Sequence, residues 1–284
     1  MSVSTDADTF GYRRRGDPSR DLILFLHGFL GASDEFDALT AELSDTYCCL
    51  SVDLPGHGAT RIASGPPGSR MAQTAQALTQ LLETLDVARA AVVGYSMGGR
   101  LALYLAVQAP PWLTHVALIS ASPGLATAAE RRARAARDEQ LARSLETEGL
   151  AHFLGRWYDQ PLFATLKAHP SFPRVLARRR RNDPAALAQS LRQLGTGQQP
   201  SLWPHLASLS IPALLLCGAR DEKFVAINGA MAAQWPTAIL QTIPDCGHAV
   251  HLEAPTIVAE RLRGFLSGHS RSTAAATRGA DGQR

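Results

Sequence analysis

Cysteine, lysine and long apolar runs are all scarce in this chain of 284 residues. The four cysteines form no CxxC pair, so we expect reduced thiols in a cytoplasmic protein and neither a disulfide framework nor a metal site. No apolar run approaches the roughly 20 residues that a membrane-spanning helix needs. The polar N-terminus also lacks the apolar core of a secretory signal. We therefore expect no contact with a membrane.

The positive charge is almost entirely guanidinium, because Lys167 and Lys223 are the only lysines. The formal net charge of +3 is too small to suggest a nucleic-acid partner. The charge is concentrated between residues 124 and 200, where 13 arginines and lysines stand against 7 aspartates and glutamates. Genomic base composition alone can account for such an arginine bias, so the charge by itself assigns no partner.

Short apolar runs alternate with longer segments of helical periodicity, which is the pattern of βαβ units around a mostly parallel sheet. The near-continuous apolar character of the runs indicates a sheet that is covered on both faces. The expected strands lie in 21–28, 48–56, 90–96, 115–122, 213–221 and 238–248. The expected helices between and after them lie in 69–86, 97–109 and 252–266.

The alternation stops between residues 124 and 205, where amphipathic helical patterns follow one another with no strand pattern between them. We interpret this segment as a helical cap, inserted into a single α/β core that residues 1–123 and 206–267 form. Residues 268–284 are small and polar, and we expect this tail to be disordered.

A serine between glycines stands where an expected strand meets the next helix. The stretch from Gly94 to Gly98 reads G-Y-S-M-G, the G-x-S-x-G pattern of a nucleophile elbow. In such a turn the serine takes a strained backbone conformation that exposes its hydroxyl at the carboxyl end of the sheet. The N-terminus of the helix favours an anionic oxygen there. Ser96 is therefore the candidate reactive group.

An elbow serine predicts an acid and then a histidine further along the chain. Asp221 stands at the end of a later strand pattern, and His248 lies in the loop before the last expected helix. His248 would take the proton of Ser96, and Asp221 would hold the histidine in the correct tautomer. Other readings stay open: Asp221 as a helix N-cap, Asp53 as the acid, and His27, His57 or His251 as the histidine.

The segment "LHGFLG" follows the first central strand, at the position that supplies an oxyanion-binding amide in such folds. We expect the amides of Phe29 and Met97 to form the oxyanion hole, with a plain βα turn as the alternative for the first. These patterns together predict an α/β-hydrolase fold with a helical cap. That fold serves esterases, C–C hydrolases, haloperoxidases and lyases alike, so it does not choose the reaction.

From residue 25 to residue 265 the sequence resembles the 2-succinyl-6-hydroxy-2,4-cyclohexadiene-1-carboxylate (SHCHC) synthases, lyases of menaquinone or phylloquinone biosynthesis. The serine turn and "HGFLG" are shared across the superfamily and say little. The cap segments "WYDQPLFATL" and "SLRQLGTGQQPSLW" are more particular to this family, as is the arginine directly after the glycine pair.

The resemblance implies elimination of pyruvate from 2-succinyl-5-enolpyruvyl-6-hydroxy-3-cyclohexene-1-carboxylate (SEPHCHC), with no cofactor, no metal and no hydrolysis. In that reaction Ser96 would act as a base toward a carbon-bound proton, with His248 and Asp221 making its oxygen basic. The rivals are a serine ester hydrolase or C–C hydrolase with the same three residues, and a non-catalytic binding protein. The chain would be a monomer or a small homo-oligomer.

The implied substrate is a small molecule with three carboxylates, a group that arginine binds through two parallel hydrogen bonds. Arg100 resembles a substrate-binding arginine of the family. The resemblance also favours Arg134 in "ERRARAARD" and Arg179 in "RRRRND", with solvated surface arginines as the alternative. Tyr95 and Trp157 are expected as cavity walls, although aromatic side chains at such positions often belong to the core.

Overall fold

The computed structural model describes residues 2–4, 9–60 and 70–278. An eight-stranded sheet lies at its centre, in the order β1-β2-β4-β3-β5-β6-β7-β8. The six strands from β3 to β8 run parallel, whereas β1 and β2 are antiparallel at one edge. The strands are β1 (Ser2–Ser4), β2 (Thr9–Arg15), β3 (Leu22–Leu26), β4 (Cys48–Val52), β5 (Ala90–Tyr95), β6 (Leu113–Ile119), β7 (Ala213–Gly218) and β8 (Ala238–Ile243).

All six expected strands are present, with ends that differ by a few residues from the predicted ones. The antiparallel edge was not predicted, because β2 reads TFGYRRR and lacks an apolar run. Each central strand faces both layers, since alternate side chains point to opposite sides. Leu24 and Val92 lie in one buried apolar cluster, and Phe25 and Val93 lie in the other.

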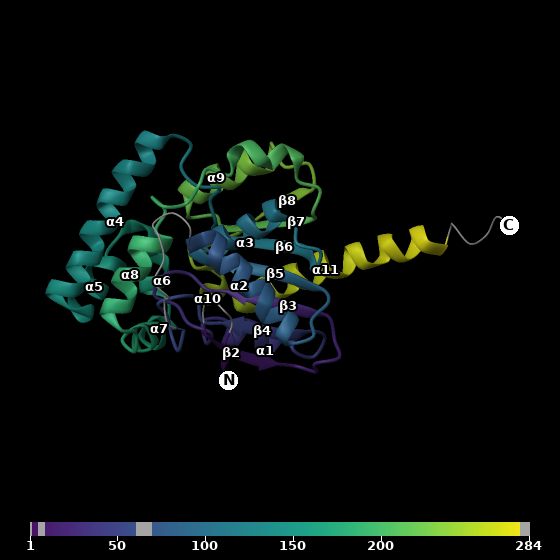
Figure 1. Cartoon of the computed structure of the whole chain (residues 1–284), viewed down its shortest axis with the longest axis horizontal. Coiled ribbons are helices and arrows are strands. Elements are labelled where there is room, and N and C mark those ends of the chain that lie inside the picture. The colour runs from purple at the N-terminus through teal and green to yellow at the C-terminus, as the bar shows by residue number, and fades with distance from the viewer. Residues whose placement is uncertain (1, 5–8, 61–69, 279–284) are drawn as a thin grey trace.

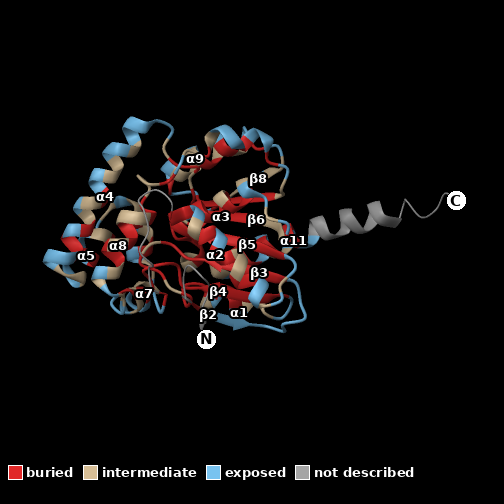
Figure 2. Ribbon diagram, in the orientation of Figure 1, coloured by how far each residue is buried: buried red, intermediate tan, exposed pale blue. Residues whose placement is uncertain are grey.

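Helices cover both faces of the sheet, whose strands form the buried centre of the molecule (Figure 2). The cluster around Leu24 includes side chains of α2, α3 and α9, and the cluster around Phe25 includes side chains of α1, α10 and α11. These helices are α1 (Asp37–Leu43), α2 (Arg70–Thr84), α3 (Met97–Gln108), α9 (Glu222–Ala232), α10 (Val250–Glu253) and α11 (Pro255–Arg278).

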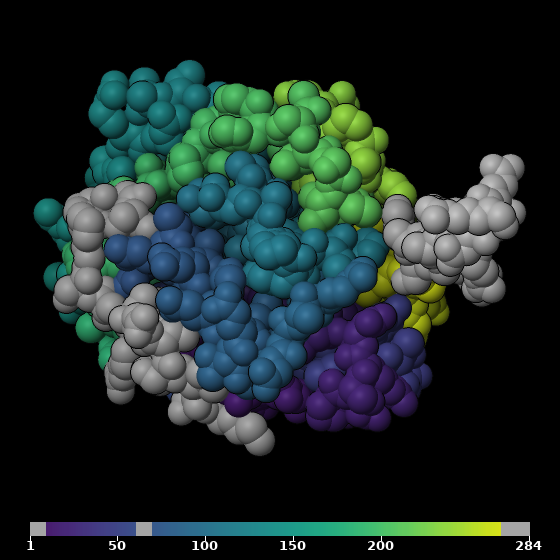
Figure 3. Space-filling model, turned by 45° about the vertical axis from the view of Figure 1, so that its right-hand side comes forward, coloured from purple at the N-terminus to yellow at the C-terminus, as the bar shows by residue number. Residues whose placement is uncertain are grey.

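Between β6 and β7, a stretch that the structure describes in full, the regular elements are all helical. The predicted cap of residues 124–205 lies in this stretch, and we keep the name cap for that segment. The cap lies on the opposite side of the molecule from α11 (Figures 1 and 3). Its elements are α4 (Ala128–Glu148), α5 (Leu150–Tyr158), η1 (Pro161–Phe163), α6 (Ala164–Ala168), α7 (Phe172–Arg179), α8 (Pro184–Leu194) and η2, which spans Trp203–Ser208.

The long cap helix α4 begins with a capping box. The Thr127 hydroxyl accepts a hydrogen bond from the Glu130 amide, and the Glu130 carboxylate accepts one from the Thr127 amide. This exchange satisfies two of the free amide groups at the helix start. The helix then packs along α8, so α4 and α8 form the main helix pair of the cap.

The end of the chain differs from the prediction of a disordered tail from residue 268. The helix α11 continues to Arg278, so residues 268–278 have a helical backbone. The sequence STAAATR contains three alanines, which have the highest helix propensity. Residues 279–284, the rest of the predicted tail, lie outside the described residues. Among the described residues, no helix combines the length and the apolar character needed to cross a membrane.

Candidate active site

Ser96 lies in a sharp turn between β5 and α3, as its glycine-flanked sequence predicts. Its backbone has φ 49° and ψ −103°, which places a non-glycine residue in a strained region. The turn is tight because a Cβ atom on Gly98 would lie 2.0 Å from the carbonyl oxygen of Leu26. The Gly98 amide donates a hydrogen bond to the His27 carbonyl at 3.0 Å, which ties the start of α3 to the end of β3.

His248 and Asp221 meet Ser96 at the carboxyl end of the sheet. The Nδ1 atom of His248 lies 2.7 Å from Oδ2 of Asp221, and its Nε2 atom lies 3.2 Å from Oγ of Ser96. A carboxylate only accepts hydrogen bonds, so Nδ1 carries the proton and Nε2 is free to accept from the serine. The His248 and Asp221 side chains are buried, whereas Ser96 is partly exposed, so the serine is the accessible end of this chain of contacts.

Asp221 has two partners, and both readings of this residue from the sequence fit its geometry. Its Oδ2 atom faces His248, while its Oδ1 atom accepts a hydrogen bond from the Phe224 amide as the N-cap of α9. The ring of Phe224 lies 4.6 Å from the His248 ring, centroid to centroid. The helix and the aromatic ring therefore fix the carboxylate and the imidazole in place.

The amides of Phe29 and Met97 are free to bind an anion. Within the part of the chain that the structure describes, neither amide has a hydrogen-bond acceptor. Phe29 follows the strand β3, to which the start of α3 is tied, and Met97 is the first residue of α3. The Met97 amide stands at the helix N-terminus, whose partial charge favours an anionic oxygen.

The competing residues Asp53, His27 and His57 have structural partners. Asp53 accepts hydrogen bonds from the amides of Ser33 and Ala59. His27 accepts from the Leu54 amide at 2.9 Å, and His57 accepts from the Leu30 amide at 3.2 Å. Burial lowers the pKa of both histidines, which fits their role as neutral acceptors. We therefore assign Asp53, His27 and His57 a structural role in holding these loops together.

A buried ionic cluster, which the sequence did not predict, lies beside the triad residues. Glu35, His251 and Arg179 meet there: the Arg179 guanidinium pairs with Glu35, and His251 Nε2 lies 3.1 Å from the same carboxylate. Burial favours the neutral acid, but Arg179 and His251 outweigh it and lower the pKa of Glu35 to about 2. The Arg179 side chain is only 4% exposed and also donates to the hydroxyl of Tyr158.

Arg179 was predicted to bind substrate, but its guanidinium already has an anionic partner, Glu35. The solvated alternative is wrong, because the side chain is buried. Tyr95, expected as a cavity wall, is buried between two histidines: its ring centroid lies 5.4 Å from that of His248 and 4.2 Å from that of His251. Burial raises the pKa of the Tyr95 hydroxyl, which keeps it neutral.

Arg100 and Arg134 differ from Arg179 in their partners. Arg100 is buried, and its guanidinium donates to the Leu194 carbonyl at 2.8 Å and to the Gln199 side-chain oxygen at 3.3 Å. Burial and the nearby charge of Arg134 lower the pKa of Arg100 to about 10, so it stays protonated at neutral pH. Arg134 is one-third exposed and pairs with Asp138 at 2.7 Å. Arg100 and Arg134 together carry two positive charges against the one negative charge of Asp138, so this group of side chains has a net positive charge.

Trp157 connects the cap to the loop that carries Phe29. Its ring lies 5.2 Å from the Phe29 ring and stacks on Phe153 at 5.5 Å. Trp157 also lines a cavity of about 350 Å³ between α4 and α5. This cavity is large enough for a small organic ligand.

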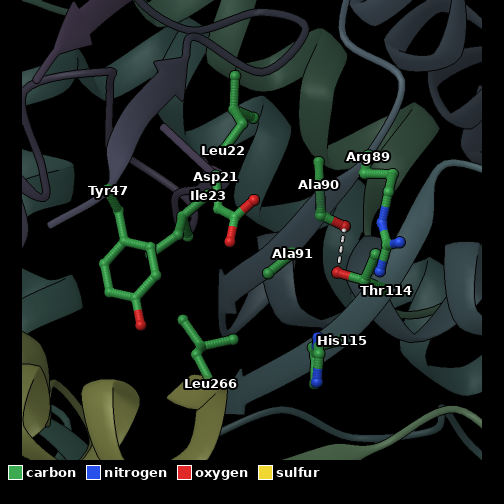
Figure 4. A pocket seen from close by; sticks show the side chains of 10 residues that line it. All are labelled: Asp21, Leu22, Ile23, Tyr47, Arg89, Ala90, Ala91, Thr114, His115 and Leu266. Atoms are coloured by element: carbon green, nitrogen blue, oxygen red, sulfur yellow. Dashed lines mark hydrogen bonds between the residues drawn. The ribbon is translucent and has the colours of Figure 1, made fainter. Parts of the chain in front are cut away.

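A second hollow lies at the other end of the sheet. It is lined by the amino ends of three strands and by Leu266 of α11, and Thr114 donates a hydrogen bond to the Ala90 carbonyl within it (Figure 4). Its volume of about 60 Å³ is enough for little more than water molecules. Ligands of open α/β sheets bind at the carboxyl ends of the strands, which is where Ser96 lies.

Comparison with known proteins shows the family to which the chain belongs. The model of the alpha/beta hydrolase fold family matches residues 21–255. A SHCHC synthase of Serratia proteamaculans is 36% identical, over 89% of this chain and 96% of that protein. The chain belongs to the SHCHC synthase family of the α/β-hydrolase fold. This confirms both the fold and the family resemblance read from the sequence.

Two further relatives agree with this assignment. The structure of MenH from S. aureus is 30% identical to the chain, with a TM-score of 0.86, and covers 94% of this chain and 100% of that one. Protein PHYLLO of Arabidopsis thaliana is 36% identical over 88% of this chain, which spans only 16% of the plant protein. The family sequence is therefore found both as a separate chain and as one part of a longer protein.

Proposed function

We propose that this chain is a carbon–oxygen lyase that eliminates pyruvate from SEPHCHC to give SHCHC. The observation that carries the proposal is the contact of Ser96, His248 and Asp221 beneath a cap whose arginines have excess positive charge. The name of the Serratia relative supports the proposal, since that protein is named for the product of this reaction.

The names of the substrate and product define the bonds that change. The substrate ring has a double bond at C3 and the enolpyruvyl ether at C5, whereas the product has double bonds at C2 and C4. A proton therefore leaves C2, its electron pair forms the C2–C3 double bond, and the old double bond moves to C4–C5. The C5–O bond breaks, and the enolate of pyruvate leaves and takes up a proton. No water is consumed.

We assign the proton transfers to the three residues in contact. Ser96 Oγ takes the C2 proton while its own proton passes to Nε2 of His248, and Asp221 stabilises the imidazolium that forms. The imidazolium then returns a proton to the leaving enolate. A serine hydroxyl is a weak base, so this step needs the buried histidine and carboxylate behind it.

The developing negative charge has a defined place on the substrate. C2 is adjacent to the ketone of the succinyl group, so removal of its proton puts charge on the ketone oxygen. We place this oxygen against the free amides of Phe29 and Met97, where fixed donors stabilise an enolate more than a ketone. Arg100 and Arg134 would bind carboxylates of the substrate, and Trp157 and Tyr95 would shape the cavity and its floor.

A coupled assay of pyruvate release tests the proposal directly. We expect the purified protein to release pyruvate from SEPHCHC, and the variant Ser96→Ala to lose turnover while it keeps its melting temperature and its affinity for the substrate. Full turnover by Ser96→Ala would show that the serine is not the base. Absence of pyruvate release from the unaltered protein would refute the lyase assignment.

Hydrolysis of esters is the second candidate, because a histidine-bound serine with two free amides is also the set of groups that acyl transfer uses. A small neutral aryl ester, assayed beside SEPHCHC, separates the two reactions. Comparable kcat/KM on both substrates would favour a hydrolase. We expect the cationic site to favour the tricarboxylate.

A further inference from the structure

The proposed substrate has three carboxylates, and the structure leaves one of them without an arginine. Arg100 and Arg134 lie close to each other, with Asp138 as the acidic group beside them. Arg179, the third arginine that the family resemblance suggested, is buried and neutralised by Glu35. A further guanidinium with no anionic partner is therefore the feature to look for around the cap.

Arg137 has this property. Its side chain makes no ion pair and no hydrogen bond with any residue in the described ranges, and it lines the cavity of about 350 Å³ between α4 and α5. The other arginine of the cavity, Arg156, pairs with Glu148 and donates to the Ser144 hydroxyl. Arg137 is thus the arginine of this cavity whose charge remains available.

The aromatic residues of the cavity, Phe153 and Trp157, contact the ring of Phe29. Phe153 and Trp157 are stacked along one wall, and the Trp157 ring contacts the ring of Phe29. The Phe29 amide is the group against which we place the succinyl ketone. Only two methylene groups separate this ketone from the terminal succinyl carboxylate. Trp157 therefore borders both the loop of Phe29 and the cavity that Arg137 lines.

We infer that Arg137 is a specificity-determining residue, which binds the terminal carboxylate of the succinyl arm in the α4–α5 cavity. The inference rests on the proposed function. The methylene groups of the arm pack on Trp157, and the guanidinium forms a charge-assisted hydrogen bond with the carboxylate. Arg134 and Arg137 are three residues apart on α4, so the same helix presents both guanidinium groups to the ligand.

The test compares Arg137→Ala with Arg132→Ala, which removes the same charge from the same helix. Both side chains are exposed, and of the two only Arg137 lines the cavity. We expect Arg137→Ala to raise KM for SEPHCHC about tenfold, because a hydrogen bond to a charged group is lost, and to change kcat by less than about twofold. Arg132→Ala should change both constants by less than about twofold. Equal KM values for the two variants would overturn the inference.

A substrate analogue identifies the carboxylate. In this analogue the terminal succinyl carboxylate is replaced by a primary amide, and the other two carboxylates are kept. The unaltered protein should show a KM about tenfold higher for the analogue than for SEPHCHC, and Arg137→Ala should add no further loss. A loss in Arg137→Ala that is just as large on the amide as on SEPHCHC would show that Arg137 does not recognise this carboxylate.

Calorimetry separates the failure of this inference from the failure of the proposed function. SEPHCHC is titrated into Ser96→Ala and into the double variant Ser96→Ala/Arg137→Ala, neither of which should turn it over. A Kd about tenfold weaker in the double variant supports the subsite. An unchanged Kd, with turnover present in the unaltered protein, overturns the subsite alone. Absence of pyruvate release by the unaltered protein removes the function, and this inference with it.

Discussion

His248 lies in the loop before α10 and His251 lies in α10, and each contacts a buried carboxylate, but their surroundings differ. His248 has Asp221 on one nitrogen and the partly exposed hydroxyl of Ser96 on the other. His251 contacts Glu35 through Nε2, and its Nδ1 has no hydrogen-bond partner among the described residues. A histidine next to a carboxylate is therefore not enough for catalysis. The group that faces its second nitrogen decides whether a proton can be passed on.

The arginines near the two histidines show the same contrast. Arg179 lies against Glu35, so that cluster is balanced in charge and closed. The hydrogen-bond partners of Arg100 are a carbonyl and an amide oxygen, and the nearby Asp138 carboxylate pairs with Arg134, so the two guanidinium groups keep a net positive charge. Buried positive charge without an anion is costly, and such a site favours an anionic ligand. We therefore expect changes in the first cluster to alter stability, and changes in the second to alter activity.

The largest effect is expected from Asp221→Asn, which tests the catalytic member of the comparison. Asparagine still caps α9, because Asn and Asp are equally good N-caps, but it cannot stabilise the imidazolium of His248. We expect kcat for pyruvate release to fall by about 10⁴-fold, with little change in the melting temperature. A kcat within about tenfold of the unaltered value would remove Asp221 from the mechanism.

Glu35→Gln tests the cluster of Glu35, His251 and Arg179, which we expect to contribute to stability. It leaves the buried Arg179 guanidinium without an anion, so we expect the free energy of unfolding, measured with urea, to fall by about 3–5 kcal/mol. The double variant Glu35→Gln/Arg179→Met removes both charges and should recover part of this loss. Unchanged stability in Glu35→Gln would mean that the ion pair does not hold the cap to the core.

Arg100→Ala should affect activity more than stability. We expect kcat/KM for SEPHCHC to fall by an amount equivalent to about 2–5 kcal/mol, because a buried substrate carboxylate loses its charged partner. Steady-state kinetics measure the loss, and Arg132→Ala serves as the control for a general change in charge. An unaltered kcat/KM would assign the carboxylates of the substrate to other residues.

Acid should destabilise the folded protein in two ranges of pH. The pKa of the buried histidines His27, His57 and His251 is lowered on folding, so their contribution to stability falls as the pH drops below about 6.5, where the unfolded chain takes up protons. The pKa of Glu35 is lowered from 4.5 to about 2, so its contribution is present above pH 4.5 and is lost as the pH falls toward 2.

Urea unfolding at a series of pH values measures both ranges. Each proton taken up on unfolding gives a slope of at most about 1.4 kcal/mol per pH unit. Glu35→Gln should reduce the slope below pH 4.5, to which other carboxyl groups with a lowered pKa also contribute, and the slope that starts near pH 6.5 should remain. A curve of the same shape below pH 4.5 in both proteins would contradict the lowered pKa of Glu35.

The sequence predicted the sheet and the three residues in contact because local patterns define them. Apolar runs define buried parallel strands, and the turn around Ser96 needs glycines at fixed positions. Asp221 and His248 follow from the order of residues that such a turn requires, with strand ends to place them. The same patterns gave Phe29 and Met97 as oxyanion amides, and that role stays a prediction.

The ionic cluster was not predictable in the same way, because Glu35 and Arg179 are far apart in the chain and only the folded structure brings them together. One local signal was present. Val175 and Arg179 are the buried residues of α7, and they are four residues apart, so they share one face of the helix. The spacing of four residues from Val175 could have indicated that Arg179, rather than another arginine of its run, is buried. It could not have identified Glu35 as the partner of Arg179.

Phe29 links the core to the cap, since its ring packs on Trp157 and its amide is one of the two that we propose bind the enolate oxygen. Anyone who grafts a foreign cap onto this scaffold to recognise other molecules would therefore also disturb the rate of the chemical step. Selectivity and speed are coupled through a single phenyl ring, and redesign has to treat them together.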